Sequence, residues 1–187
     1  MEAIRTSRLT LEPLVVAHAD AMFDLLGDQN IYRYLDYPPP PSVESLRDRY
    51  RRLETRASPD GRQAWLNWIV CPHGRPPLGY VQATVPSDRD AYVAYVFATN
   101  HWGHGFAREA VHAMLEHLAA SYDVNQYRAT VEAGNERSIR LLRRLGFQLA
   151  TRSALGAHNS STELVYVKSA NQEDHIQRFR ERDHRVD

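Results

Sequence analysis

The fold is decided by the stretch Asn100-His101-Trp102-Gly103-His104-Gly105-Phe106-Ala107-Arg108-Glu109-Ala110. It follows an aromatic and β-branched run, Ala91–Ala98, and leads into a segment with the apolar periodicity of a helix packed on a core. The apolar positions are Ala107, Ala110, Val111, Met114, Leu115 and Leu118. A helix begins with unpaired N–H groups and a dipole that favours negative charge, so this turn predicts a phosphate site. A tight turn alone also explains Gly103 and Gly105.

Two better-known phosphate motifs do not fit this sequence. No G-x-x-x-x-G-K-[ST] occurs in it, which excludes a P-loop. Arg108 stands where a dinucleotide-binding G-x-G-x-x-G has its third glycine, and the stretch lies in the middle of the chain without an early βαβ unit. A Rossmann site is therefore disfavoured.

A second informative stretch lies just downstream. Tyr127–Ala133 alternates like a strand, and Asn135 after it is a good helix N-cap. Ser138–Leu145 carries an apolar face and an arginine-rich face, as an amphipathic helix does. Gly146 suits the left-handed position after a helix, with Phe147 placed to pack back on it.

Together the two stretches resemble the GNAT family of acyl-CoA-dependent N-acetyltransferases, and more narrowly the branch that acetylates the N-terminal amines of ribosomal proteins. The family's coenzyme signature, [Q/R]-x-x-G-x-[G/A], reads Asn100–Gly105 here, with Asn in place of the usual Gln or Arg. The branch's W-G-x-G-x-A-x-E-A matches Trp102–Ala110, and its N-x-x-S followed by L-G-F matches Asn135–Phe147. An opening R-L-x-L-x-P-L fits Arg8–Leu14, so the resemblance covers about residues 8–168.

The resemblance implies an α/β fold, a splayed central mixed sheet with helices on both faces. Arg8–Glu12 alternates like an edge strand. Further strands are expected at Trp65–Val70, Leu78–Val85, Ala91–Ala98, Tyr127–Ala133, Phe147–Arg152 and Glu163–Lys168, the last two around a polar loop, Ser153–Thr162. Helices are expected at Val15–Leu26, Ser42–Arg56, Ala107–Ser121 and Ser138–Leu145. Residues 1–169 are interpreted as one domain, and the polar residues 170–187 as a tail.

Composition narrows the class of protein further. Hydrophobic residues make up 43% of the 187 positions and charged residues 25%, which is ordinary for a soluble globular domain. A formal net charge of zero disfavours a nucleic-acid or membrane partner. The single cysteine, Cys71, excludes an intramolecular disulfide and favours a reducing, cytoplasmic location. No apolar run approaches the length of a membrane span or resembles a signal peptide.

The cosubstrate implied by the resemblance is acetyl-CoA, with no metal. Its pantetheine arm is expected along the strand ending at Phe97 and Ala98, and a free amide near Phe97 is expected to polarise the thioester carbonyl. The pyrophosphate is expected on backbone amides of the turn, where His104 is equally well explained as a surface histidine. The expected coenzyme-binding residues are Phe97, Ala98, Gly103, His104, Gly105, Phe106, Ala107 and Asn135.

Catalytic groups are only partly indicated. The resemblance implies that the hydroxyl of Ser138 protonates the departing thiolate, since Leu142 occupies the place where many GNAT proteins carry a tyrosine. Tyr92 stands where the branch often has a glutamate base. Asp88, Asp90, His158 and Glu163 are alternatives, and a water-relayed base is another, so no base is assigned.

The acceptor is expected between the first two helices, where Tyr34, Asp36 and Tyr37 precede the stiff run Pro38–Pro41. These residues fit an amine pocket, with Asp36 attracting the ammonium group, and they also fit a simply packed loop. A protein N-terminus and a small-molecule amine are both open as acceptors. The rival hypothesis is an acyl-CoA-binding module without turnover. A homodimer is expected from the resemblance.

Overall fold

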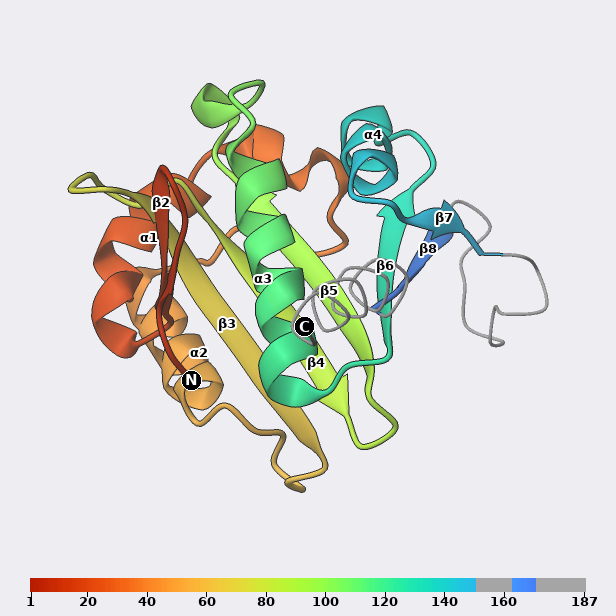
Figure 1. The fold of residues 1–187 in the computed structure, drawn as a ribbon. Coiled ribbons are helices and arrows are strands. Elements are labelled where there is room, and N and C mark those ends of the chain that lie inside the picture. Colours follow the sequence, from red (N-terminus) through yellow and green to blue (C-terminus); the bar gives the residue numbers. More distant parts are fainter. Residues whose placement is uncertain (151–162, 171–187) are drawn as a thin grey trace, which may run out of the picture.

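The computed structural model describes residues 1–150 and 163–170 (Figure 1). His158, the predicted polar loop 153–162 and the tail beyond Ala170 therefore lie outside the described residues. The strands are β1 (Ile4–Arg5), β2 (Leu9–Pro13), β3 (Gln63–Pro72), β4 (Gly79–Pro86), β5 (Asp90–Phe97), β6 (Gln126–Glu132), β7 (Gln148–Leu149) and β8 (Glu163–Ser169). The α-helices are α1 (Ala19–Leu26), α2 (Val43–Glu54), α3 (Phe106–Tyr122) and α4 (Glu136–Arg144).

All eight of these strands form one mixed sheet, in the order β1-β2-β3-β4-β5-β6-β8-β7. Neighbouring strands are antiparallel except for β5 and β6, which are parallel. That parallel pair extends only from Asp90–Gln126 to Tyr92–Arg128, although β5 continues to Phe97. The second half of β5 therefore diverges from β6, which confirms the predicted splayed sheet.

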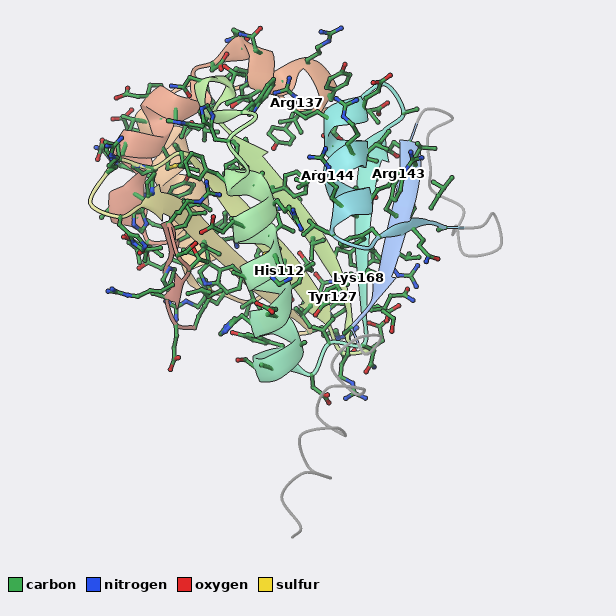
Figure 2. All side chains as sticks on the ribbon, turned by 45° about the horizontal axis from the view of Figure 1, so that its top comes forward. His112, Tyr127, Arg137, Arg143, Arg144 and Lys168 are labelled. Carbon is green, nitrogen blue, oxygen red and sulfur yellow. The ribbon has the colours of Figure 1, made fainter. Side chains whose placement is uncertain are left out.

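Helices cover both faces of the sheet, as expected (Figure 1), and their side chains fill the space between helices and strands (Figure 2). One core lies between α3, α4 and the strands, and contains Trp68, Met114 and Leu142. A second core lies beneath α1 and α2, and contains Met22, Leu46 and Val96. Alternate residues of β5 enter different cores, since Val93 and Phe97 point toward α3 whereas Val96 points toward α1 and α2.

Local signals set the helix ends. The Ser42 hydroxyl accepts from the Ser45 N–H at 3.1 Å and begins α2 directly after the proline run. Asn135 caps α4 by accepting from the Ser138 N–H at 3.2 Å. Gly146 has a φ of 85°, and the Phe147 N–H donates to Leu142 O at 3.0 Å, as in a Schellman end.

Three predicted segments differ in the structure. The expected helix Val15–Leu26 begins with a 3-10 turn, Val16–His18, because the His18 Nδ1 accepts from the Val15 N–H at 3.1 Å. The expected edge strand Arg8–Glu12 lies inside the sheet, since the two-residue β1 pairs outside it. The strand expected from Phe147 starts one residue later and is assigned only at Gln148–Leu149, because Phe147 belongs to the end of α4.

Candidate active site

The opening between β5 and β6 is lined by backbone as well as by side chains. Ala98 N–H donates to Leu78 O at 3.0 Å, so the alternation of an antiparallel ladder turns the amides of Tyr95 and Phe97 away from β4, into the opening. The Phe97 carbonyl accepts from Trp102 Nε1 at 2.8 Å, which leaves the Phe97 amide facing the opening. Both backbone groups of Ala98 form hydrogen bonds within the protein, since its N–H donates to Leu78 O and its carbonyl accepts from the His101 N–H.

The turn before α3 has the geometry of an anion cradle. Gly103 and Gly105 adopt φ values of 82° and 80°, which side-chain-bearing residues rarely do. Gly105 is the N-cap of α3 and no side chain caps that end. The first turn of the helix closes when the Glu109 N–H donates to Gly105 O at 3.1 Å, so the preceding amides of Phe106 and Ala107 have no helical acceptor.

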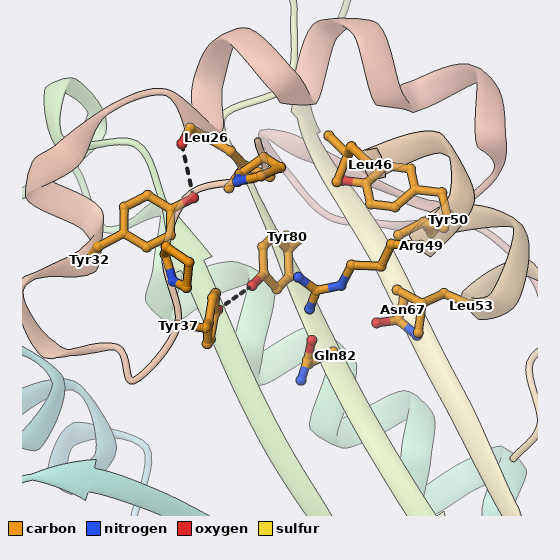
Figure 3. Close-up of a pocket in the computed structure, with 13 residues that line it drawn as sticks. Leu26, Tyr32, Tyr37, Leu46, Arg49, Tyr50, Leu53, Asn67, Tyr80 and Gln82 are labelled. Carbon is orange, nitrogen blue, oxygen red and sulfur yellow. Dashed lines mark hydrogen bonds between the residues drawn. The ribbon is translucent and has the colours of Figure 1, made fainter. Parts of the chain in front are cut away.

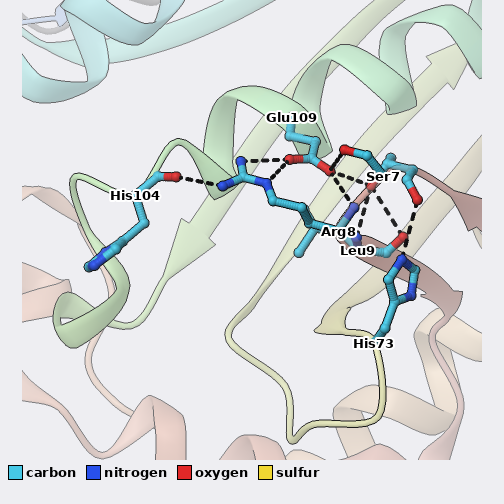
Figure 4. A network of polar contacts seen from close by, with 7 residues as sticks. Ser7, Arg8, Leu9, His73, His104 and Glu109 are labelled. Carbon is cyan, nitrogen blue, oxygen red and sulfur yellow. Dashed lines mark hydrogen bonds and ion pairs between the residues drawn. The ribbon is translucent and has the colours of Figure 1, made fainter.

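A polar network fixes this turn to the start of the chain (Figure 4). Glu109 accepts from Arg8 Nε at 2.6 Å, from the Thr6 hydroxyl at 2.6 Å and from the Arg8 N–H at 3.0 Å. Arg8 also donates to His104 O at 3.0 Å and stacks over the Phe106 ring. Burial opposes ionisation of Glu109, but the hydrogen bonds from Thr6 and Arg8 outweigh it and lower the pKa of that carboxyl. Arg8 thus balances the one carboxylate in the first turn of α3.

A cavity of about 540 Å³ lies at the opening between β5 and β6 and reaches the first turn of α3 at Ala107. This volume falls within the range of small-molecule sites. Its lining comes from β5, the first turns of α3 and α4, and the 3-10 helix Gln29–Tyr34 (η2). Among the predicted site residues it contains Tyr34, Phe97, Ala107, Asn135 and Ser138. The other predicted coenzyme-binding residues do not line it: Ala98, Gly103, His104, Gly105 and Phe106. The His104 ring is stacked on that of Phe106.

Comparison with known proteins assigns the family. The model of the acetyltransferase (GNAT) domain matches residues 8–148. An uncharacterized N-acetyltransferase, p20 of Bacillus licheniformis, is 31% identical over 150 residues, which are 79% of this chain and 83% of that protein. The chain belongs to the GNAT acetyltransferase family. It is an N-acetyltransferase that transfers the acetyl group of acetyl-CoA to an amine.

Solved GNAT structures share the fold at low sequence identity. RimL, a ribosomal L7/L12 α-N-protein acetyltransferase solved with coenzyme A, superposes with a TM-score of 0.76 at 18% identity. The match covers 90% of this chain and 98% of RimL. The microcin C7 self-immunity acetyltransferase MccE, solved with acetyl-CoA and AMP, gives 0.74 at 16% identity, covering 88% and 93% of the two chains.

In this GNAT protein the Ser138 hydroxyl is hydrogen-bonded to a tyrosine hydroxyl. It lies 2.7 Å from the hydroxyl of Tyr95, which reaches it from β5. Burial raises the pKa of Tyr95 to about 12, and the hydrogen bond with Ser138 opposes that rise only in part. Tyr95 is therefore a neutral proton donor near pH 7. Sequence reasoning missed it, although its place on the same strand face as Phe97 is a usable signal.

The candidates for a general base are scattered. Tyr92 is 55% exposed, and Asp90 forms an ion pair with Arg128 at 2.8 Å. Glu163 begins β8 opposite Glu132, at the end of β6 from which β5 has diverged, but it does not line the cavity. The carboxylate that does line the cavity is Glu136, which sequence reasoning did not consider and which pairs with Arg140 at 3.0 Å. Among the described residues, no group of three His, Cys, Asp or Glu side chains could hold a metal.

The three predicted acceptor residues do not meet in one place. Tyr34 lines the cavity beside Ser138. Tyr37 lines a separate cavity beneath α2, and its hydroxyl lies 3.1 Å from that of Tyr80. Asp36 is exposed and lines neither of these two cavities. Leu142, at the position of the tyrosine of other GNAT proteins, is buried in the core.

Proposed function

We propose that acetyl-CoA lies in the 540 Å³ cavity with its pyrophosphate on the amides before and within the first turn of α3. The observation that carries this placement is the uncapped start of α3 beside the diverging end of β5. Gly103 shapes the turn, and amides of His104, Gly105, Phe106 and Ala107 are the proposed donors. The proposed contacts of the pantetheine arm and the thioester are Asn135, the amide of Phe97 and, at the end of the same strand, Ala98.

The proposed reaction needs few side chains. The neutral amine attacks the thioester carbon, the new N–C bond forms, and the C–S bond breaks as the tetrahedral intermediate collapses. The Phe97 amide stabilises the developing oxyanion. Ser138 donates its proton to the thiolate and takes one from Tyr95, which its 2.7 Å contact supports. The proton that the amine loses passes to solvent, and Tyr95 takes a proton back from solvent, which restores both hydroxyls.

The acceptor is proposed to enter from the side of η2 and the proline run. Tyr34 borders the acetyl site, Tyr37 borders the neighbouring cavity, and the exposed Asp36 attracts the ammonium group from the surface. RimL supports a protein N-terminus as acceptor, and the AMP held by MccE supports a small molecule.

A cytoplasmic location and a homodimer complete the proposal. No helix among the described residues has the length and apolarity to cross a bilayer.

Thiol release from acetyl-CoA, measured with a panel of primary amines and N-terminal peptides, tests this function. Release that depends on an amine and yields the N-acetyl product supports it. The rival, an acyl-CoA-binding module, is motivated by Tyr92 and Leu142, which stand at positions that often carry catalytic groups in the family. Coenzyme binding by calorimetry without amine-dependent release would favour that rival and overturn the catalytic assignment.

A further inference from the structure

A second cavity, of about 30 Å³, lies beneath α2 and the proline run (Figure 3). Its volume is enough for roughly two water molecules, so it fits a small functional group and not a whole acceptor. It is lined by Leu14, Leu26, Tyr32, Tyr37, Pro38, Pro40, Leu46, Arg49, Tyr50, Leu53, Asn67, Tyr80 and Gln82.

The lining of this cavity carries positive charge and no negative charge. Arg49 is the single charged residue of the lining, and Figure 3 shows its guanidinium between Tyr80 and Gln82. Within residues 1–150 and 163–170, Arg49 forms no ion pair, although its neighbours on α2, Arg47 and Arg51, pair with Asp20 and Asp48. Its nearest recorded partner is the ring of Tyr37, at 5.7 Å.

Further polar groups line the cavity beside the guanidinium. Asn67 is only 6% exposed, and its side-chain amide forms no hydrogen bond with any residue that the structure describes. Because this amide lines the cavity, a ligand there can supply the hydrogen bonds that the protein does not. The Tyr37 and Tyr80 hydroxyls lie 3.1 Å apart at the same place. Burial raises the pKa of Tyr80, which therefore remains a neutral donor.

The cavity lies next to the reaction centre. Tyr80 on β4 is directly opposite Val96 on β5, and Val96 lines the acetyl-CoA cavity. The strand spacing of about 4.8 Å puts the opening between β5 and β6 roughly 5–10 Å from the guanidinium side of β4. A molecule held by Arg49 can therefore reach the thioester with a group several bonds away.

We propose that this cavity binds an anionic group of the acceptor, a carboxylate or a phosphate, through Arg49, Asn67 and the Tyr37–Tyr80 hydroxyls. The guanidinium is well suited to either oxyanion because its donors form a planar fork. The acceptor class is an amine that carries an anion several bonds from its nitrogen. This inference rests on the proposed function, since it concerns the acceptor of the same reaction.

Matched amines test it with the full-length protein and acetyl-CoA. The series glycine, β-alanine, γ-aminobutyrate, aminovalerate and aminohexanoate is compared with the corresponding neutral amides, and aminoalkyl phosphates form a second arm. The expected result is a kcat/KM at least about tenfold higher for the anionic member, with the longer spacers preferred over glycine. Whichever arm reacts faster distinguishes carboxylate from phosphate.

Variants connect that preference to the cavity. Arg49→Gln should lower kcat/KM for the anionic amines by about tenfold to a hundredfold and change the neutral amides by less than about threefold. Asn67→Asp, which adds a carboxylate to the cavity lining, should also abolish the preference. Arg52→Gln is the matched control, an exposed arginine of the same helix outside the cavity lining, and should behave as wild type. Thermal unfolding confirms that each variant is folded.

Two results would overturn the inference, and they differ from a failure of the proposed function. Turnover of neutral amines without a preference for the anionic ones would refute the anion site and leave acetyl transfer intact. An equal loss of kcat/KM for the anionic amine and its neutral amide in Arg49→Gln would do the same. If no amine reacts, the proposed function fails, and calorimetry with the N-acetylated ω-amino acids then decides about the site. Binding to wild type but not to Arg49→Gln supports it, whereas equal or absent binding refutes it.

Discussion

The proposed coenzyme side and the proposed acceptor side of this molecule are built in different ways. The coenzyme side consists mainly of backbone, with two left-handed glycines, the start of α3 and the diverging end of β5. The acceptor side consists of side chains from η2, α2, β3 and β4 that converge on a small cavity. A backbone site tolerates most side-chain changes but not a change in the turn, whereas a side-chain site depends on single residues.

Gly105→Asp is the strongest test of the proposed coenzyme side, which consists mainly of backbone. Asp at a φ of 80° is strained, and its carboxylate would face the proposed pyrophosphate. We expect coenzyme affinity to fall about a hundredfold, while the fold persists because the new Cβ meets only Arg8 Nη2 at 3.4 Å. Calorimetric titration with acetyl-CoA measures the loss.

The control for this change is Gly61→Asp. Gly61 has a similar φ of 69° in a turn between α2 and β3, so this variant carries the same strain without the cradle. Unchanged coenzyme affinity in a folded Gly105→Asp protein would refute the cradle.

Ser138→Ala tests the proposed general acid, which lies between the proposed coenzyme and acceptor sides. If Ser138 protonates the thiolate, kcat should fall about tenfold to a hundredfold, the low end of general-acid effects because a thiolate leaves readily. Coenzyme affinity should stay nearly intact. Steady-state turnover and thermal unfolding of the same variant separate this role from a structural role in the first turn of α4.

Tyr95→Phe is the companion measurement, since it removes the hydroxyl 2.7 Å from Ser138 and keeps the ring. We expect a smaller fall in kcat than for Ser138→Ala, and little further loss in the double variant. Wild-type turnover in Ser138→Ala would exclude that residue as the acid.

Sequence reasoning succeeded where local signals determine structure. Gly105, Asn135 and Gly146 each sit at a helix end, and their backbone roles follow from residue type and spacing. The splay between β5 and β6 came from the family resemblance and is confirmed by the short register of that pair. The backbone features on which the proposed coenzyme site rests were therefore predictable, while the site itself stays a prediction.

The acceptor side was not predictable for a physical reason. Arg49 and Asn67 belong to different elements, a helix and a strand, and only packing of α2 on the sheet brings them into one lining. Likewise, Tyr95 meets Ser138 across the sheet opening, 43 residues along the chain. No local pattern encodes such contacts, so Tyr34, Asp36 and Tyr37 were grouped by sequence although they separate in space.

Glu109→Gln probes the side-chain support beneath the backbone cradle. The lowered pKa of Glu109 means that its ionised form stabilises the folded state. This stabilisation is present above the ordinary carboxyl pKa of 4.5 and is lost as pH falls through the lowered folded-state value. We expect Glu109→Gln to cost about 1–2 kcal/mol at pH 7, and the difference from wild type to vanish in acid. Denaturant unfolding at several pH values measures it; a constant difference would contradict the assigned cause.

The smallest effect is expected for Asp36→Asn, which tests whether the acceptor is oriented by two opposite charges. Asp36 is exposed and lines neither cavity, so it can act on an ammonium group only through solvent, by weak attraction. We expect the KM of the acceptor to rise about twofold to threefold at low salt and the difference to disappear near 0.15 M, where the Debye length is about 8 Å. Arg49, whose guanidinium lies within the cavity lining, should retain most of its effect in the same salt. A large, salt-independent loss in Asp36→Asn would mean that the ammonium group contacts Asp36 directly, and that η2 and the proline run close over the acceptor when it binds.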